Sequence, residues 1–165
     1  MTNKMAMQPR IRFLLIVFMC GLAASGLTAI PLRWELKILM PFIEKGSVLG
    51  IIFPAMIEWM ERISDGLQNG YGRYPFLAYG TDWLAFGHVA IALSFFGPLR
   101  DPVRNIWVIE FGIITCILVI PWVLIFGAIR DIPFFWQLID ISFGIIGIIP
   151  LWLARRDILK ISREL

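Results

Sequence analysis

Four long runs of apolar residues constrain this chain more than any other feature. They cover about residues 11–32, 83–99, 106–129 and 134–154. A helix needs about 20 predominantly apolar residues to cross the hydrocarbon core of a bilayer. Only 16% of the 165 residues are charged, whereas a soluble domain carries about 25%. The runs therefore predict an all-α, polytopic membrane protein that folds as a single four-transmembrane-helix bundle.

The first run follows basic residues and so also resembles a signal peptide, which ends in a small-residue cleavage site. Only Ala24-Ser25-Gly26 comes close to such a site, and no clear polar break precedes it. An uncleaved membrane anchor is therefore favoured. Pairs of small residues let neighbouring helices approach closely in lipid, so we expect helix packing at Gly21 and Ser25 and at Gly144 and Gly147.

The segment between the first and second runs carries too many charges for an ordinary span. Residues 47–67 hold about a dozen apolar residues before the charges begin, which is short for a crossing and typical of an interfacial helix. Residues 68–81 contain turn formers such as Gly70 and Pro75. We therefore expect an interfacial helix followed by an ordered aromatic loop, which holds all three tyrosines of the chain: Tyr71, Tyr74 and Tyr79.

Basic residues are denser beside one end of the predicted spans than beside the other. Short cytoplasmic segments are enriched in lysine and arginine. Tryptophan prefers the boundary between headgroups and hydrocarbon, and Trp107 and Trp152 are expected at this boundary on the side with the dense basic residues. The pattern predicts a plasma (inner) membrane protein with both termini in the cytoplasm and a C-terminal tail that forms a short surface helix. The dense side holds Lys4, Arg10, Arg12, Arg100, Arg104, Arg155, Arg156, Lys160 and Arg163.

Ionisable residues inside the predicted spans are candidate functional residues, because an unpaired charge is costly in hydrocarbon. His88 lies about six residues into the second span and Asp140 about seven residues into the fourth from the same side, so at about 1.5 Å per residue their depths nearly match. An imidazole and a carboxylate at one level can act as general acid and base. We treat His88 and Asp140 as a candidate catalytic pair. Alternatively, they only fix the helix register by bonding each other, Ser142, Gln137 or a loop amide.

Glu110 lies about five residues into the third span from the cytoplasmic side, which is about 7 to 8 Å along a helix. It belongs to a different layer from His88 and Asp140. The simplest expectation is a structural ion pair with Arg100 or Arg104. Glu110 is nevertheless a candidate ligand-binding residue, together with the tyrosines that would roof a pocket at the outer ends of the spans: Tyr71, Tyr74 and Tyr79.

Known cofactor and metal motifs do not stand in the sequence, so we expect no cofactor and no metal. The chain has one histidine, and its two cysteines, Cys20 and Cys116, lie within apolar runs without metal-ligand spacing. Phosphate-binding and dinucleotide-binding fingerprints are missing. The formal net charge of +3 comes from basic residues beside apolar runs, which indicates membrane topology and no nucleic acid.

Three functions remain open. The favoured one is a non-enzymatic accessory, scaffold or lipid-binding bundle, whose partners are membrane lipids and a second copy of the chain or another membrane protein. The second is a membrane-embedded enzyme or binder of an apolar, lipid-like or isoprenoid-like ligand that uses His88 and Asp140. A proton-coupled transporter or channel is weaker, because only Thr115 would connect Glu110 to the outer pair.

Overall fold

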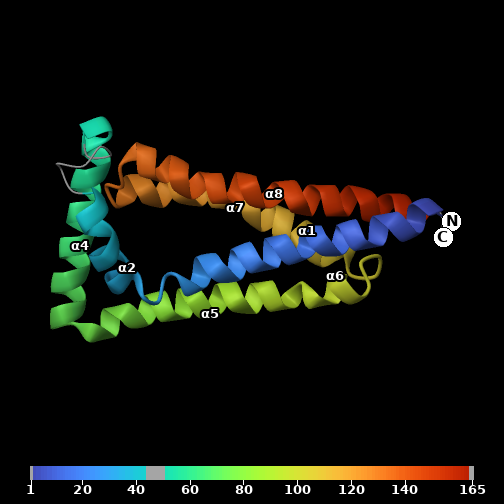
Figure 1. Ribbon diagram of the computed structural model, residues 1–165, viewed down its shortest axis with the longest axis horizontal. Helices are drawn as coiled ribbons and strands as arrows, with labels where there is room; N and C mark the ends of the chain where they lie inside the picture. Colours follow the sequence, from blue (N-terminus) through green and yellow to red (C-terminus); the bar gives the residue numbers. More distant parts are fainter. Residues whose placement is uncertain (1, 44–50, 164–165) are drawn as a thin grey trace. The chain divides into compact units, whose positions relative to one another are not determined.

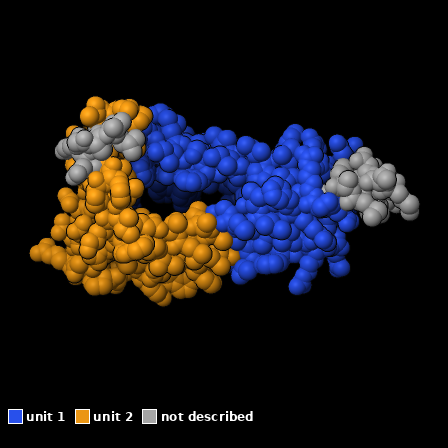
Figure 2. All heavy atoms as spheres, viewed as in Figure 1, with its two compact units in different colours: residues 1–22, 90–165 blue, residues 23–89 orange. Residues whose placement is uncertain are grey.

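The computed structural model describes residues 2–43 and 51–163, with side chains from residue 8 onward in the first range (Figure 1). The described residues are almost entirely helical and contain no strand, which confirms the all-α prediction. The chain divides into two compact units (Figure 2). Unit 1 consists of residues 1–22 and 90–165, and unit 2 consists of residues 23–89.

Unit 1 is built around a hairpin of two long helices that lie side by side (Figure 1). In the turn between them Asp131 has a φ of 53°, a left-handed conformation that aspartate tolerates better than most residues. Unit 1 also takes the first part of α1 and the last residues of α5. The helices that lie wholly or partly in unit 1 are, in chain order, α1 (Thr2–Leu27), α5 (Ala78–Ser94), α6 (Phe96–Arg100), α7 (Ile106–Ile129) and α8 (Phe134–Arg163).

Small residues set the distance between α7 and α8. A Cβ atom on Gly144 would lie 2.6 Å from the backbone oxygen of Cys116, and one on Gly147 would lie 3.0 Å from the sulfur of Cys116. The predicted packing role of these two glycines is therefore confirmed. Gly21 differs, since a Cβ atom there would meet nothing within 4 Å, so the expectation of close packing at Gly21 is wrong.

The core of unit 1 joins segments from both ends of the chain. It contains a cluster of buried side chains from α1, α7 and α8, together with Phe95 between α5 and α6. Because Ile158 and Ile161 belong to this cluster, one face of the last turns of α8 is buried. The expectation of a short surface helix after residue 154 is wrong: α8 continues without a break to Arg163. The cluster consists of Ile11, Leu15, Phe95, Val108, Ile109, Leu151, Ala154, Ile158 and Ile161.

Unit 2 contains two amphipathic helices that pack against each other, α2 (Leu32–Ile43) and α4 (Pro54–Arg73). Pro54 begins α4. A proline lacks the backbone N–H, and this costs nothing in the first turn because an N–H there has no partner within the helix. Residues 51–67 of the predicted interfacial helix are largely helical, and residues 47–50 lie outside the described residues. Helix α2 is not expected from the sequence, because its charges conceal an apolar face that buries Leu36 and Ile43.

The predicted aromatic loop at residues 68–81 is mostly helical, so this part of the prediction is wrong. Helix α4 continues through Gly70 and Gly72, since a glycine costs a helix only about 1 kcal/mol. The chain leaves the helix at Tyr74, which precedes the short 3₁₀ helix η1 (Pro75–Leu77) and the start of α5. Pro75 alone acts as the expected turn former.

Four helical segments of the described chain are long and apolar enough to cross a membrane. The third and fourth begin where the sequence predicts, whereas α1 ends at Leu27 because a turn follows it, and the second candidate begins before Trp83. Large apolar side chains along these segments are exposed, among them Phe13, Trp122 and Phe143. The segments are Gln8–Leu27, Pro75–Arg100, Ile106–Ile129 and Phe134–Arg163.

Candidate functional site

Asp157 is a charged residue in the core of unit 1, with only 1% of its surface exposed. It lies on the face of α8 that also carries Ala154, Ile158 and Ile161. A buried carboxylate is costly unless charged or hydrogen-bonding groups surround it. Asp157 is not among the site residues expected from the sequence. The available signal was the helical spacing of these apolar residues, which places position 157 on the buried face.

Two arginines stabilise the buried Asp157 carboxylate. Nε and Nη2 of Arg156 donate to Oδ1 at 3.2 and 3.1 Å. Nε of Arg10 on α1 lies 3.5 Å from Oδ2, which accepts no hydrogen bond within the described residues. Oδ2 is thus stabilised by charge attraction to Arg10 and not by a hydrogen bond from the described residues, and the exposure of Arg10 weakens that attraction. The ion pair with Arg10 connects the beginning of α1 to the end of α8.

Glu110 on α7 forms an ion pair with Arg155 on α8. Nε and Nη2 of Arg155 lie 2.9 and 2.8 Å from Oε1 of Glu110. The expectation of a pair with Arg100 or Arg104 is wrong. Glu110 faces α8 across the hairpin, while the segment that carries Arg104 is held by its own turn, in which the Arg104 amide donates to Oδ1 of Asp101 at 3.0 Å.

An open groove of about 240 Å³ lies on the side of α8 that faces away from the core. The residues that line the groove recur every three or four positions along α8, as residues on one face of a helix do. The guanidinium of Arg156 lies 5.8 Å from the centre of the Trp152 ring, within the range of a cation–π interaction. We call this feature the α8 basic groove, lined by Trp152, Arg155, Arg156, Leu159, Lys160 and Arg163.

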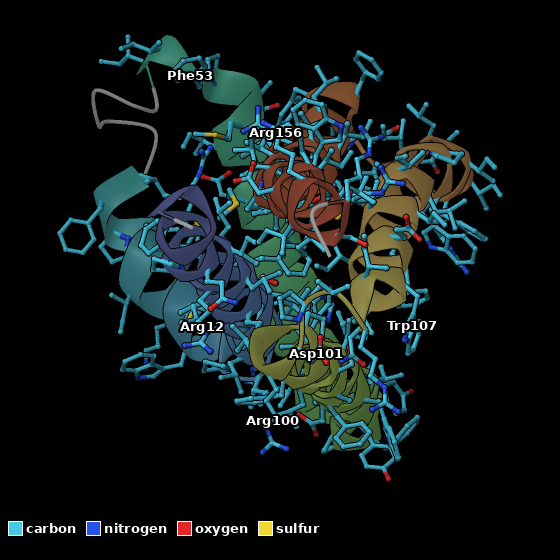
Figure 3. The ribbon with its side chains drawn as sticks, turned by 90° about the vertical axis from the view of Figure 1, so that its right-hand side faces the viewer. Arg12, Phe53, Arg100, Asp101, Trp107 and Arg156 are labelled. Atoms are coloured by element: carbon cyan, nitrogen blue, oxygen red, sulfur yellow. The ribbon has the colours of Figure 1, made fainter. Side chains whose placement is uncertain are left out.

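The α8 basic groove lies at the end of unit 1 where α1 begins and α8 ends (Figure 1). Figure 3, which looks toward this end, shows Arg12, Arg100 and Arg156 coming from α1, α6 and α8. Asp101 and Trp107 are also labelled there, beside the start of α7. Helices of unit 1 that are separate in the chain therefore bring basic side chains to one end of the unit.

His88 lies in the part of α5 that belongs to unit 2. Its Nδ1 is 2.8 Å from the backbone oxygen of Leu84. A carbonyl can only accept a hydrogen bond, so Nδ1 carries the proton and Nε2 of the neutral ring is the acceptor. The end of α1 packs directly against this residue, because a Cβ atom on Gly26 would clash with the Cβ of His88. His88 thus fixes the close approach of α1 and α5 within unit 2.

Asp140 lies half-buried on α8 in unit 1 and forms no ion pair or side-chain hydrogen bond with the described residues of that unit. Two partners considered for it bond backbone oxygens: Ser142 donates to Ile139 at 2.6 Å, and Gln137 donates to Ile132 at 2.8 Å. His88 and Asp140 belong to different units. Their catalytic pairing stays a prediction.

The three tyrosines all belong to unit 2, with Tyr71 on α4, Tyr74 at its C-terminal end and Tyr79 on α5. Tyr74 and Tyr79 are exposed. Their rings pack edge to face on Phe76 and Trp83, with centroid distances of 6.0 and 5.9 Å. The ligand-binding role of the tyrosines and of Glu110 stays a prediction.

No group of three or more histidine, cysteine, aspartate or glutamate side chains suited to a metal ion occurs in the described part of the chain. Cys20 and Cys116 are free thiols. Comparisons with protein-family models, curated proteins and solved structures gave no match. The fold and its polar clusters therefore define the class only as an α-helical protein with four helices suited to a membrane.

Proposed function

We propose that this chain is a multi-pass protein of the plasma membrane that acts without catalysing a reaction, as an accessory, scaffold or lipid-binding protein. The observation that carries the proposal is that two of the ionisable side chains within the candidate spans are occupied by contacts with other parts of the chain. His88 bonds the backbone of its own helix, and Glu110 bonds Arg155 of a neighbouring helix. The Glu110 pair joins α7 to α8, and the His88 bond occupies Nδ1 within α5, so a structural contact accounts for each group.

The proposed orientation has both termini in the cytoplasm. It is supported by the basic residues at the end of unit 1 where α1 begins and α8 ends, since short cytoplasmic segments are rich in lysine and arginine. The exposed apolar side chains of α7 and α8 favour membrane lipids as partners. A second copy of the chain or another membrane protein is the further proposed partner.

The proposal is tested with His88→Ala, Asp140→Asn and Glu110→Gln in the full chain. The expected result is a change in stability or assembly with membrane insertion retained. The physical reason is clearest for His88, which lies against Gly26, and for Glu110, which pairs with Arg155. Stability is followed by thermal unfolding in detergent, and assembly by native mass spectrometry. The non-enzymatic role is contradicted when a variant folds, inserts and assembles as the wild type does but abolishes a cellular phenotype that the wild type restores.

A second candidate function is favoured by one observation, namely that Asp140 has no ion pair or side-chain hydrogen bond within the described residues of unit 1. A carboxylate in a span without such a partner is a candidate for chemistry or for ligand binding. The alternative is a membrane-embedded enzyme or binder of an apolar ligand that uses Asp140 with His88. Saturable binding of an isoprenoid-like probe that Asp140→Asn abolishes would favour it.

A further inference from the structure

We infer that the α8 basic groove binds the headgroup of an anionic phospholipid. This inference rests on the proposed function, and it names the lipid class and the residues that recognise it. The groove is lined by four basic side chains, Arg155, Arg156, Lys160 and Arg163, beside the indole of Trp152. Basic pockets at the cytoplasmic ends of membrane helices are suited to negatively charged headgroups.

The charge of the groove remains positive after its internal ion pairs are taken into account. Glu110 pairs with Arg155, and Asp157 is shared between Arg156 and Arg10. Lys160 and Arg163 form no ion pair with the described residues. In the described part of the chain these two positive charges therefore have no acidic partner, and the paired arginines keep N–H groups that can donate to phosphate oxygens.

The ion pairs also hold two of the lining side chains in place before a ligand arrives. Arg155 is held by Glu110 of α7, and Arg156 is held by the buried Asp157 and by the ring of Trp152. A side chain that is already ordered loses less conformational entropy when it binds. The structure thus combines two positioned guanidinium groups with two cations that pair with no described residue, Lys160 and Arg163, on one helix face.

Trp152 places the groove at the depth of the lipid headgroups. The indole ring prefers the boundary between hydrocarbon and water. Trp152 is exposed at the near end of the groove, and Trp107 is exposed at the start of α7, at the same end of unit 1. Both rings precede the basic side chains on the path out of the apolar segments. A phosphodiester at this depth meets the basic side chains while its acyl chains lie along the apolar part of α8.

The test uses the full-length protein in detergent, with phosphatidylglycerol or phosphatidylcholine added and bound lipid counted by native mass spectrometry. Both lipids carry a phosphodiester, but only phosphatidylglycerol has a net negative charge. The variant is Lys160→Gln combined with Arg163→Gln. The matched control is Arg100→Gln combined with Arg104→Gln, which removes the same charge outside the groove. Thermal unfolding of each variant checks that the fold is retained.

Wild type and the control are expected to retain phosphatidylglycerol in preference to phosphatidylcholine. The groove variant is expected to bind phosphatidylglycerol about thirty-fold more weakly, since each basic residue near an anionic surface contributes about 1 kcal/mol and 1.4 kcal/mol corresponds to about tenfold. Equal loss in the groove variant and the control would overturn the inference, because the effect would then reflect general charge.

Two further outcomes separate this inference from the function on which it rests. Retention of both lipids without preference would overturn the headgroup site and leave a lipid-binding protein. Retention of neither lipid would overturn the site and count against the lipid-binding role as well. In a last experiment, inorganic phosphate is added to the protein with bound phosphatidylglycerol. If phosphate displaces the lipid at equal concentration, the groove recognises free phosphate and the lipid assignment is wrong.

Discussion

At the scale of single residues, Asp157 shows why a charge is retained in an apolar cluster. The cost of burying its carboxylate is offset by Arg156 on the same helix and by Arg10 on α1. Both arginines are partly exposed, with 52% of the Arg10 side chain and 40% of the Arg156 side chain open. The pair with Arg10 therefore contributes less through its net energy than through the register it imposes on α1 and α8.

Arg10→Gln is expected to destabilise unit 1 by about 1 to 2 kcal/mol, because Asp157 would stay buried with one cationic partner fewer. Thermal unfolding in detergent measures the change. Arg12→Gln is the matched control, since it removes the same charge from an exposed position on α1 and is expected to cost less than about 0.5 kcal/mol. Equal destabilisation by the two substitutions would contradict this role of Arg10.

The pair of Glu110 with Arg155 leads to a second prediction. A double-mutant cycle with Glu110→Gln and Arg155→Gln is expected to give a coupling energy of about 0.5 kcal/mol, because the two side chains are 41% and 38% exposed and water weakens their attraction. Chemical denaturation of the purified protein measures the coupling. The cycle of Glu110 with Arg104→Gln should show none, and coupling there instead would restore the pair expected from sequence.

Sequence reasoning identified Glu110 as a residue that needs a partner, but it selected the wrong one. Nearness in the chain favoured Arg100 and Arg104, whereas the actual partner is 45 residues away on α8. Periodicity fixes which face a residue occupies, but it does not fix which face of another helix lies opposite. For Asp157 the buried face could have been predicted from the spacing of Ala154, Ile158 and Ile161, whereas its partner Arg10 on α1 could not.

At the scale of helices, the contact between α7 and α8 depends on Gly144. The Cβ of any other residue would approach the backbone oxygen of Cys116 to 2.6 Å, and backbone atoms cannot move aside without separating the helices. Packing of small residues is a main source of helix association in lipid, where apolar surface alone gives no preference for protein over acyl chains. The hairpin is therefore expected to be sensitive at this position.

Gly144→Ala is expected to weaken the hairpin by about 1 to 3 kcal/mol, as overpacking does in well-packed cores. Unfolding by increasing fractions of sodium dodecyl sulfate in mixed micelles provides the measurement. Gly21→Ala serves as the control, because a Cβ atom there meets nothing within 4 Å and alanine favours a helix. The assignment would be wrong if both alanine variants resisted the detergent as well as the wild type does.

Helix boundaries were predicted well where apolar runs end in charged or turn-forming residues, as at Ile106 and Phe134. They were predicted poorly where an amphipathic helix continues beyond such a signal. Helix α8 passes the basic residues after Ala154 because Ile158 and Ile161 extend its buried face. Helix α4 passes Gly70 because a single glycine is tolerated when the rest of the helix is packed.

At the scale of the whole molecule, the four apolar runs carried the sequence prediction. Length and composition alone were enough to expect four helices that can cross a membrane, since both are local properties of the chain. The His88 and Asp140 pair depends on how segments of the two units face each other. That relation is set by packing between remote residues, which local patterns do not encode.

The proposed orientation predicts that reporter tags fused at Met1 and Leu165 are both cytoplasmic. A cysteine placed at Asp131, in the turn between α7 and α8, should instead react with a membrane-impermeant thiol reagent added outside. This follows from the basic residues at the opposite end of the hairpin. Labelling in intact cells and in opened cells is compared, with Arg104→Cys as the cytoplasmic control. Tags in opposite compartments would contradict an even number of crossings.

The discontinuous make-up of unit 1 also has a consequence for biosynthesis. Its core brings Ile11 and Leu15 together with Ile158 and Ile161. A ribosome produces the first pair long before the last, so under the proposed membrane insertion α1 would enter the bilayer without the neighbours that later cover it. Until residue 161 has emerged, that helix depends on lipid, an insertase or a chaperone to shield its inner face. The contact between α1 and the end of α8 can therefore form only after translation has passed Ile161.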